Sequence, residues 1–190
     1  MRIDLQLYLA TKMRATDQVS AFLSNLGIQR SEAERAAVRV DELYKLSSPG
    51  TSARVYSELA GEPVEEFVVC STATPSEFAG SVRRRYLLPP WDTSLFEVNE
   101  HPDGYAWGER FVRGAVHTLP TDPNRLRVWQ CTLETAKAAA SAEREIDVWS
   151  DRHDAYFSFV VGQKVATFLG RFDFGLLQQW TAVDLETRVD

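Results

Sequence analysis

The dipeptide Gly162-Gln163 constrains the fold of this chain more than any other feature of its sequence. It separates two runs that are rich in aromatic and β-branched residues, 156–161 and 164–172. A two-residue connection that contains glycine is typical of a tight β-hairpin, because glycine readily adopts the positive φ that such turns need. The chain is therefore expected to contain antiparallel strands.

Alternating apolar residues predict further strands. In residues 3–9, Ile3, Leu5, Leu7 and Leu9 alternate with Asp4, Gln6 and Tyr8, which is the period-2 pattern of a half-buried strand. The other runs predicted as strands are residues 53–59, 64–71, 94–98, 105–119, 125–132 and 183–189.

Helices are predicted where the apolar period lengthens to 3.6 residues. In residues 16–26, Val19, Phe22 and Leu26 share one face, and Gly27 follows as a stop. Ser31 and Glu34 form a capping-box pattern that opens a second helix. The predicted helices after the first are residues 31–45, 74–88, 134–149 and a short one around 176–180.

These elements predict an α+β fold in which antiparallel sheets carry helices packed on one face. Each half reads approximately as strand, helix, two strands, helix and strand, which favours two tandem ferredoxin-like (βαββαβ) pseudo-halves, 1–103 and 104–190. The length of 190 residues suits a single compact unit, 1–190. One larger antiparallel sheet covered by helices on one side is the alternative.

Composition excludes several classes of protein. The hydrophobic fraction of 44% indicates a globular chain, and the net charge of −6 argues against unspecific attraction to nucleic acid or an anionic membrane. No apolar run approaches the roughly 18 residues of a membrane span, and Asp4 lies where a signal peptide needs basic residues. These two observations lead us to expect a cytoplasmic protein. Because 17 of the 21 basic residues are arginine, which suggests a GC-rich genome, we expect the protein to be bacterial.

Common catalytic and cofactor motifs are absent from the sequence. It contains no Gly-x-x-x-x-Gly-Lys, Gly-x-Gly-x-x-Gly, His-Glu-x-x-His or Gly-x-Ser-x-Gly. His101, His117 and His153 are too far apart for a local zinc site. Cys70 and Cys131 lie in separate apolar stretches and are predicted to be buried free thiols. No metal and no cofactor is expected.

Residues 105–119 contain the strongest candidate for a ligand site. In an unbroken strand, Glu109, Arg113 and His117 would share a face with Tyr105, Trp107 and Phe111. Glu109 or His117 could then act as a general base and Arg113 as an anion clamp. A structural face with internal ion pairs is the alternative, and Gly108 or Gly114 could introduce a bulge that breaks the alternation.

Two charged runs have simpler interpretations. The run Arg83-Arg84-Arg85 falls in the last turns of a predicted helix, where cations meet the negative end of the dipole. The run Asp151-Arg152-His153-Asp154 contains metal-binding and acid/base residue types, but four consecutive polar residues are more typical of a turn.

An acidic stretch offers a surface for a protein partner. Exposed acids would speed encounter with a basic protein, and an aromatic residue would supply buried area. A solvated loop is the alternative interpretation. The candidate partner-binding residues are Trp91, Asp92, Glu97, Glu100 and Asp103.

Three functions remain open from the sequence. Acidity, size and absent motifs favour a non-catalytic intracellular binding protein, for instance an immunity or antitoxin-type inhibitor that recognises a basic partner protein. The second hypothesis is a small-molecule enzyme or ligand-binding domain that uses Glu109, Arg113 and His117. The third is RNA binding or processing, which rests on analogy with ferredoxin-like folds and is opposed by the net charge.

Overall fold

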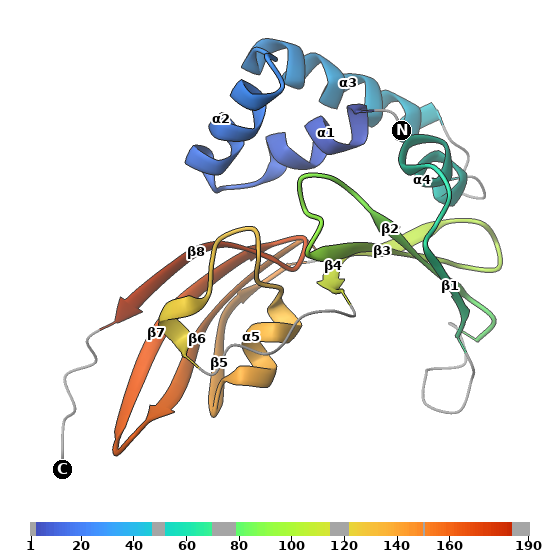
Figure 1. Ribbon diagram of the computed structural model, residues 1–190. Helices are drawn as coiled ribbons and strands as arrows, with labels where there is room; N and C mark the ends of the chain where they lie inside the picture. Colours follow the sequence, from blue (N-terminus) through green and yellow to red (C-terminus); the bar gives the residue numbers. More distant parts are fainter. Residues whose placement is uncertain (1–2, 47–51, 70–78, 115–121, 150, 184–190) are drawn as a thin grey trace.

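A computed structural model describes residues 3–46, 52–69, 79–114, 122–149 and 151–183. The described elements are five α-helices, one 3₁₀ turn and two four-stranded antiparallel sheets (Figure 1). In chain order they are α1 (Asp4–Lys12), α2 (Thr16–Asn25), α3 (Arg30–Leu46), α4 (Ser52–Ala60), β1 (Glu65–Val68), β2 (Val82–Leu87), β3 (Ser94–Glu100), β4 (Ala106–Arg113), η3 (Pro123–Arg125), α5 (Leu133–Ala139), β5 (Ala142–Val148), β6 (Arg152–Val161), β7 (Lys164–Asp173) and β8 (Leu176–Val183).

Each sheet is a meander in which every strand pairs with its neighbour in the chain. Sheet A has the order β1-β2-β3-β4 and sheet B the order β5-β6-β7-β8. Helices α1 to α4 lie together over one face of sheet A, and α5 lies against sheet B (Figure 1). The prediction of an α+β fold with antiparallel sheets is confirmed.

The order of the described elements differs from the tandem ferredoxin-like arrangement. Four helices precede sheet A, and no described helix separates its four strands. The predicted boundary at residue 103 falls in the turn between the paired strands β3 and β4, whereas the change of sheet comes between β4 and β5.

The prediction of a strand in residues 3–9 is wrong, because this segment forms α1. Leu5, Leu7 and Leu9 are all buried in the main hydrophobic core, together with Ala10, and Gln6 is also buried. A helix that is buried on most sides shows no 3.6-residue period, so alternation along the sequence cannot identify it. Leucine, glutamine, alanine and lysine all favour helix, which agrees with the structure.

Tertiary pairing overrides several other local patterns. Residues 53–59 lie in α4, residues 126–131 form turns and irregular backbone after the 3₁₀ turn Pro123–Arg125, and residues 176–180 belong to β8. The long helix predicted for residues 134–149 ends at Ala139, because Ser141 hydrogen-bonds through both its backbone N–H and its hydroxyl to the Ser158 carbonyl. This pairing starts β5, which occupies the rest of the predicted helix.

Other predictions agree with the structure. Helices α2 and α3, the strands β1 and β3, and the β6–β7 hairpin occur where the sequence predicted them, with Gly162 at φ +64° in the turn. Cys131 is a buried free thiol. The helix start at residues 74–77, the final strand at 184–189, Cys70 and His117 lie outside the described residues.

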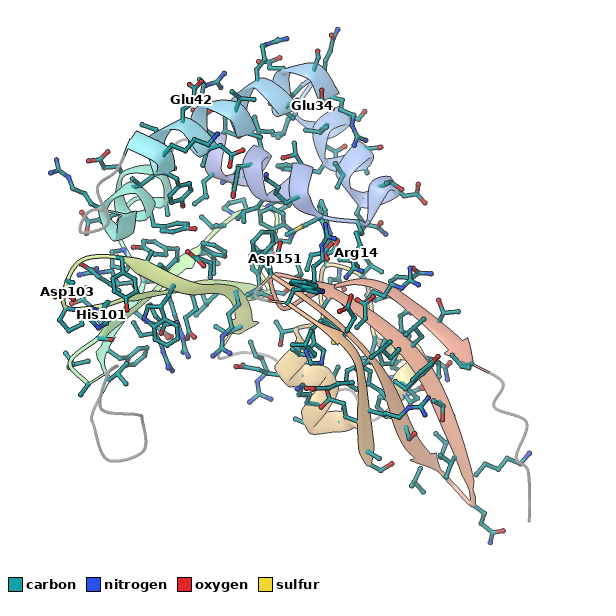
Figure 2. All side chains as sticks on the ribbon, turned by 180° about the vertical axis from the view of Figure 1, so that it is seen from behind. Arg14, Glu34, Glu42, His101, Asp103 and Asp151 are labelled. Atoms are coloured by element: carbon teal, nitrogen blue, oxygen red, sulfur yellow. The ribbon has the colours of Figure 1, made fainter. Side chains whose placement is uncertain are left out.

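Arg14 joins the helical layer to sheet B, from the connection between α1 and α2 (Figure 2). Its backbone N–H and its Nε donate to the Asp173 carboxylate at 2.7 and 2.8 Å. Its two terminal nitrogens donate to Asp154 at 3.1 and 2.8 Å. Because Asp154 lies on β6 and Asp173 on β7, this bidentate network fixes the helices over the second sheet.

A buried glutamine continues the same junction. The Gln178 Oε1 on β8 accepts hydrogen bonds from the Ala15 backbone N–H and from the Trp129 indole, both at 3.2 Å. The helical layer, the segment before α5 and sheet B therefore meet at one polar side chain, and this contact positions the site described below.

Among the described residues, no helix combines the length and apolar character needed to cross a bilayer.

Candidate functional site

A cavity of about 160 Å³, with both polar and apolar walls, lies where the start of β3, the end of β4 and the segment before α5 meet. We call it the arginine pocket, because three of its lining side chains are arginines. Its lining residues are Thr93, Ser94, Arg113, Arg125, Leu126, Arg127, Gln130, Cys131, Thr132 and Thr135. They come from three separate segments of the chain, so the fold alone brings them together.

A tight turn anchored by Trp91 presents the hydroxyls of the pocket. The Trp91 N–H donates to the Leu88 carbonyl at 2.8 Å, and the Ser94 N–H donates to the Trp91 carbonyl at 3.0 Å. Trp91 is buried, with ring centroids 5.0 Å from Phe111 and 5.4 Å from Trp129. This packing fixes the position of the following residues, Thr93 and Ser94, at the end of sheet A.

The opposite wall is a loop with an unusual backbone conformation at Trp129. This residue has φ +64°, a left-handed conformation that costs a bulky side chain about 1–3 kcal/mol. Two hydrogen bonds hold it there, since its N–H donates to the Leu177 carbonyl at 2.9 Å and its indole donates to Gln178. The strained turn directs the chain from Arg127 to Gln130 along the pocket.

The charge of the pocket is opposite to that of the whole chain. Among the residues that the structure describes, its lining includes three arginines and no acid, although the protein carries a net charge of −6. Arg113 makes no ion pair with the part of the chain that the structure describes. Arg125 lies 3.8 Å from Asp122, and Arg127 donates to the Asn124 carbonyl at 2.7 Å. The exposed guanidinium groups therefore form a positive rim.

Two hydroxyls in the lining have unused hydrogen-bonding capacity. Ser94 is 1% exposed, and neither its Oγ nor the buried Oγ1 of Thr93 has a hydrogen-bond partner among the described residues. Leaving a buried polar group unpaired costs about 1–3 kcal/mol, so such groups indicate a position where a ligand or water binds. By contrast, the hydroxyls of Thr132 and Thr135 bond to each other at 2.9 Å.

Cys131 does not supply a nucleophile to this pocket. Burial raises the pKa of its thiol to about 12, and its Sγ donates to the Thr132 carbonyl at 3.4 Å. A thiol reacts as its thiolate, which is scarce at neutral pH when the pKa is this high. Arginines and hydroxyls are thus the lining groups that are available to a ligand.

Of Glu109 and Arg113, the two predicted site residues on this strand that the structure describes, Arg113 lies in the pocket. Glu109 is on the helical side of sheet A, where its Oε1 accepts a hydrogen bond from the Tyr56 hydroxyl at 3.2 Å. His117 lies outside the described residues. Glu109 and Arg113 therefore contact different parts of the protein. Arg113, the predicted anion clamp, lines the arginine pocket, and Glu109 does not.

The expected shared face along this strand is interrupted by a bulge. The β3–β4 register shifts between Glu97 and Asn99, and Gly108 has φ +63°. Trp107 pairs with Asn99, and Asn99 is on the same face of β3 as Glu97. Phe111 pairs instead with Phe96 in the helix-covered core. The prediction that Trp107 shares a face with Phe111 is therefore wrong, and the cause is the break at Gly108 that the sequence allowed.

Two of the predicted partner-binding residues are buried. Trp91 is 1% exposed and its ring is covered by other aromatic side chains. Glu97 has a fully buried side chain on β3, paired with Arg85 at 2.9 Å, Arg110 at 3.1 Å and Arg83 at 3.6 Å. The expectation that this stretch is an exposed loop is wrong for both residues, because most of it forms a central strand of sheet A.

The remaining acids of that stretch do not form one patch. Asp92 and Asp103 are exposed at opposite ends of the seven-residue strand β3, which places them about 20 Å apart. Asp103 lies beside His101 at the end of sheet A (Figure 2). Glu100 is partly exposed and pairs with Arg84. A role of Asp92, Glu100 and Asp103 in binding a basic partner stays a prediction.

The run Arg83-Arg84-Arg85 is part of β2, and its prediction as a helix end is wrong. Side chains alternate across a strand, so Arg83 and Arg85 point to the face of Glu97 while Arg84 pairs with Glu66 at 2.9 Å. Arg85 also pairs with Glu65 at 2.9 Å. These arginines are ion-paired across sheet A, in contrast to Arg113.

One group of side chains has the composition of a metal site. Glu143, Glu145 and His153 have ligand atoms within 4.8 Å of one another. His153 Nε2 lies 2.9 Å from Glu143, and Lys137 Nζ lies 3.0 Å from Glu143 and 3.6 Å from Glu145. The single ammonium group pairs with both acids and offsets one of their two negative charges, which accounts for the group as an ion-pair network. Residues 152–154 belong to β6, so the prediction of a polar turn there is wrong.

Comparison of the chain with protein-family models, with curated proteins and with solved structures finds no match in any of the three. Sequence reasoning identified Arg113 but missed Thr93, Ser94, Arg125 and Arg127. No local motif joins these residues, since they meet only through the turn at Trp91 and the loop at Trp129. The pair of arginines beside a proline-rich turn was the one available signal.

Proposed function

We propose that this protein is a non-catalytic binding protein that holds a small anion of the phosphate or carboxylate class in the arginine pocket. The observation that carries the proposal is a cavity whose described charged lining residues are all arginines and whose wall contains Ser94, a buried hydroxyl with no hydrogen-bond partner among the described residues. An anion would accept hydrogen bonds from this hydroxyl and from Arg113, and both groups would gain a charge-assisted partner.

The size of the pocket supports a small anionic group. Cavities that enclose drug-sized molecules measure about 300–1,000 Å³. The arginine pocket, at about 160 Å³, suits an oxyanion or the anionic end of a larger compound. Arginine matches the geometry of carboxylate and phosphate oxygens through paired N–H donors, which supports the same class of ligand.

The lining residues support binding more than catalysis. The described lining residues include no carboxylate or histidine that could act as a general base, and the pKa of the Cys131 thiol is raised to about 12. This proposal keeps the predicted role of Arg113 as an anion clamp. It assigns no role to Glu109, whose carboxylate accepts a hydrogen bond from Tyr56.

Titration of ¹⁵N-labelled protein with inorganic phosphate, sulfate and acetate tests the proposal. Binding is monitored through the amide chemical shifts. We expect saturable binding of at least one anion with a Kd of about 1 mM, because a few charge-assisted hydrogen bonds must offset the entropy lost on association. The shifted amides should include those of Ser94 and Gln130, and binding should weaken as ionic strength rises.

Variants identify the pocket as the site of binding. Arg113→Gln and Ser94→Ala should each weaken binding about tenfold or more, since a hydrogen bond to a charged group contributes about 1.5–3 kcal/mol. Arg39→Gln is the matched control, because this exposed arginine pairs with Asp4 on the helical layer. Anion binding that is equally strong in Arg113→Gln and wild type, or no saturable binding at all, contradicts the proposal.

A further inference from the structure

A second cavity adjoins the arginine pocket. It measures about 280 Å³, and the two cavities share Thr93 and Gln130 in their linings. We call it the apolar cavity after its wall of Phe22, Pro90, Val128 and Trp129, although half of its lining residues are polar. Its lining residues are Gln18, Ala21, Phe22, Asn25, Pro90, Asp92, Thr93, Val128, Trp129 and Gln130. A ligand bound in one cavity would therefore contact residues that also line the other.

The walls of the apolar cavity suit a flat hydrophobic group. Phe22 from α2 and Trp129 meet edge to face with ring centroids 6.2 Å apart, and Pro90 and Val128 complete the apolar surface. Both aromatic residues are mostly buried by packing against Trp91. Rigid aromatic walls bind a ring at low entropic cost, because few side-chain rotations are lost.

Charge distinguishes the two cavities. The arginine pocket is rimmed by three guanidinium groups, whereas the one charged residue among the described lining residues of the apolar cavity is the exposed acid Asp92. An anionic group is attracted to the first cavity and repelled from the second. A ligand that carries both kinds of group would therefore bind in one orientation.

The strained backbone at Trp129 lies between the two cavities. Trp129 lines the apolar cavity, and its neighbour Gln130 lines both. Strained conformations of this kind are concentrated at ligand clamps and active sites, where the surrounding structure holds them. Here the Leu177 carbonyl and Gln178 hold the backbone and the indole of Trp129. This observation is independent of the arginines and of the Ser94 hydroxyl.

We propose that the two cavities form one bipartite site for a small organic anion that carries an aromatic ring. The phosphate or carboxylate lies in the arginine pocket, near Arg113 and Ser94, and the ring lies in the apolar cavity against Phe22 and Trp129. The inference rests on the proposed function, because it requires the arginine pocket to bind an anion. It adds the chemical class of the group attached to that anion.

The test compares methyl phosphate with phenyl phosphate, which share the anion and differ in the ring. Phenyl phosphate should bind wild-type protein about tenfold more tightly, since the ring is removed from water. Ala21→Trp places a bulky side chain at the apolar cavity and should abolish this advantage, while methyl phosphate binding stays unchanged. Ser24→Trp is the matched control on the exposed side of α2, and it should keep the advantage.

A measurement on the unmodified protein guards against misfolding of the Ala21→Trp variant. The indole N–H resonance of Trp129 should shift with phenyl phosphate and much less with methyl phosphate. Equal affinity of the two compounds, or an advantage that Ala21→Trp leaves intact, overturns the bipartite site and leaves anion binding standing. Absence of binding by both compounds overturns the anion-binding function itself, and the bipartite site with it.

Discussion

Replacing Glu97 by glutamine should destabilise the fold substantially. The Glu97 side chain is fully buried, and its two oxygens contact arginines at 2.9 and 3.1 Å, with a third arginine at 3.6 Å. Removing one partner of a fully buried ion pair costs about 3–5 kcal/mol. Here the three arginines are 24–46% exposed and keep contact with water, so the cost is smaller, about 2–3 kcal/mol.

Urea unfolding measures this cost. The free energy of unfolding of Glu97→Gln should fall by about 2–3 kcal/mol with an unchanged m-value, and the melting temperature should fall by about 5–10 °C for a chain of this length. Glu34→Gln is the matched control, because Glu34 is 59% exposed and pairs with Arg30 one helical turn away. That change should cost about 0.3–0.5 kcal/mol.

The result also decides between two interpretations of residues 92–103. If Glu97 lay in a solvated acidic loop, its substitution would change stability by less than about 0.5 kcal/mol, as surface changes usually do. A loss below about 1 kcal/mol in Glu97→Gln, indistinguishable from the Glu34 control, would refute the argument that this buried acid stabilises the fold through its three arginines.

Three further predictions test burial and backbone conformation. In a Cys70→Ser background, iodoacetamide should modify Cys131 at pH 8 about three orders of magnitude more slowly in folded than in unfolded protein, because a pKa of about 12 leaves little thiolate. The rate in folded protein should rise with pH. Comparable rates in folded and unfolded protein would show an accessible thiol. Gly175→Ala should lower the free energy of unfolding by more than about 2 kcal/mol, since φ is +72° and the new Cβ would lie 2.9 Å from the Phe111 carbonyl oxygen. Gly162→Ala, with open space around it, is the control and should cost about 1 kcal/mol. Equal losses would contradict the role of the Phe111 contact. Leu7→Ala should cost about 2–5 kcal/mol, because Leu7 is 2% exposed within α1, and a loss below about 1 kcal/mol would place it outside the core.

The parts of the fold that could be predicted are those specified by neighbouring residues. The β6–β7 hairpin follows from Gly162 and its flanking strands, and α2 follows from its apolar stripe and the glycine after it. By contrast, α1 is buried on most sides and therefore lacks an amphipathic pattern. Strand β2 contains three consecutive arginines, and only its partners across sheet A make it extended. Long-range pairing of this kind leaves little local signal.

The candidate site shows the same division. Arg113 was predicted as an anion clamp because it lies on a recognisable strand. The residues that face it, Ser94, Arg125 and Arg127, are distant in sequence and carry no spacing that marks them. The burial of Trp91 and Glu97 could not be predicted from the sequence either, since both occur near charged residues that suggested an exposed surface. The packing of the turn at Trp91 against the loop at Trp129 supplies this information, and it exists only in three dimensions.

The long sequence separation of the Arg14 contacts has a consequence for synthesis of the chain. Asp154 and Asp173 follow Arg14 by 140 and 159 residues, so the ribosome makes both acids long after the helices that they fasten. The leucines of α1 belong to the same core as strands of sheet A that are synthesised later, so the nascent helical segment lacks part of its apolar cover until those strands leave the ribosome. Among the described strands β8 is made last, and it supplies the Gln178 contact that supports Trp129.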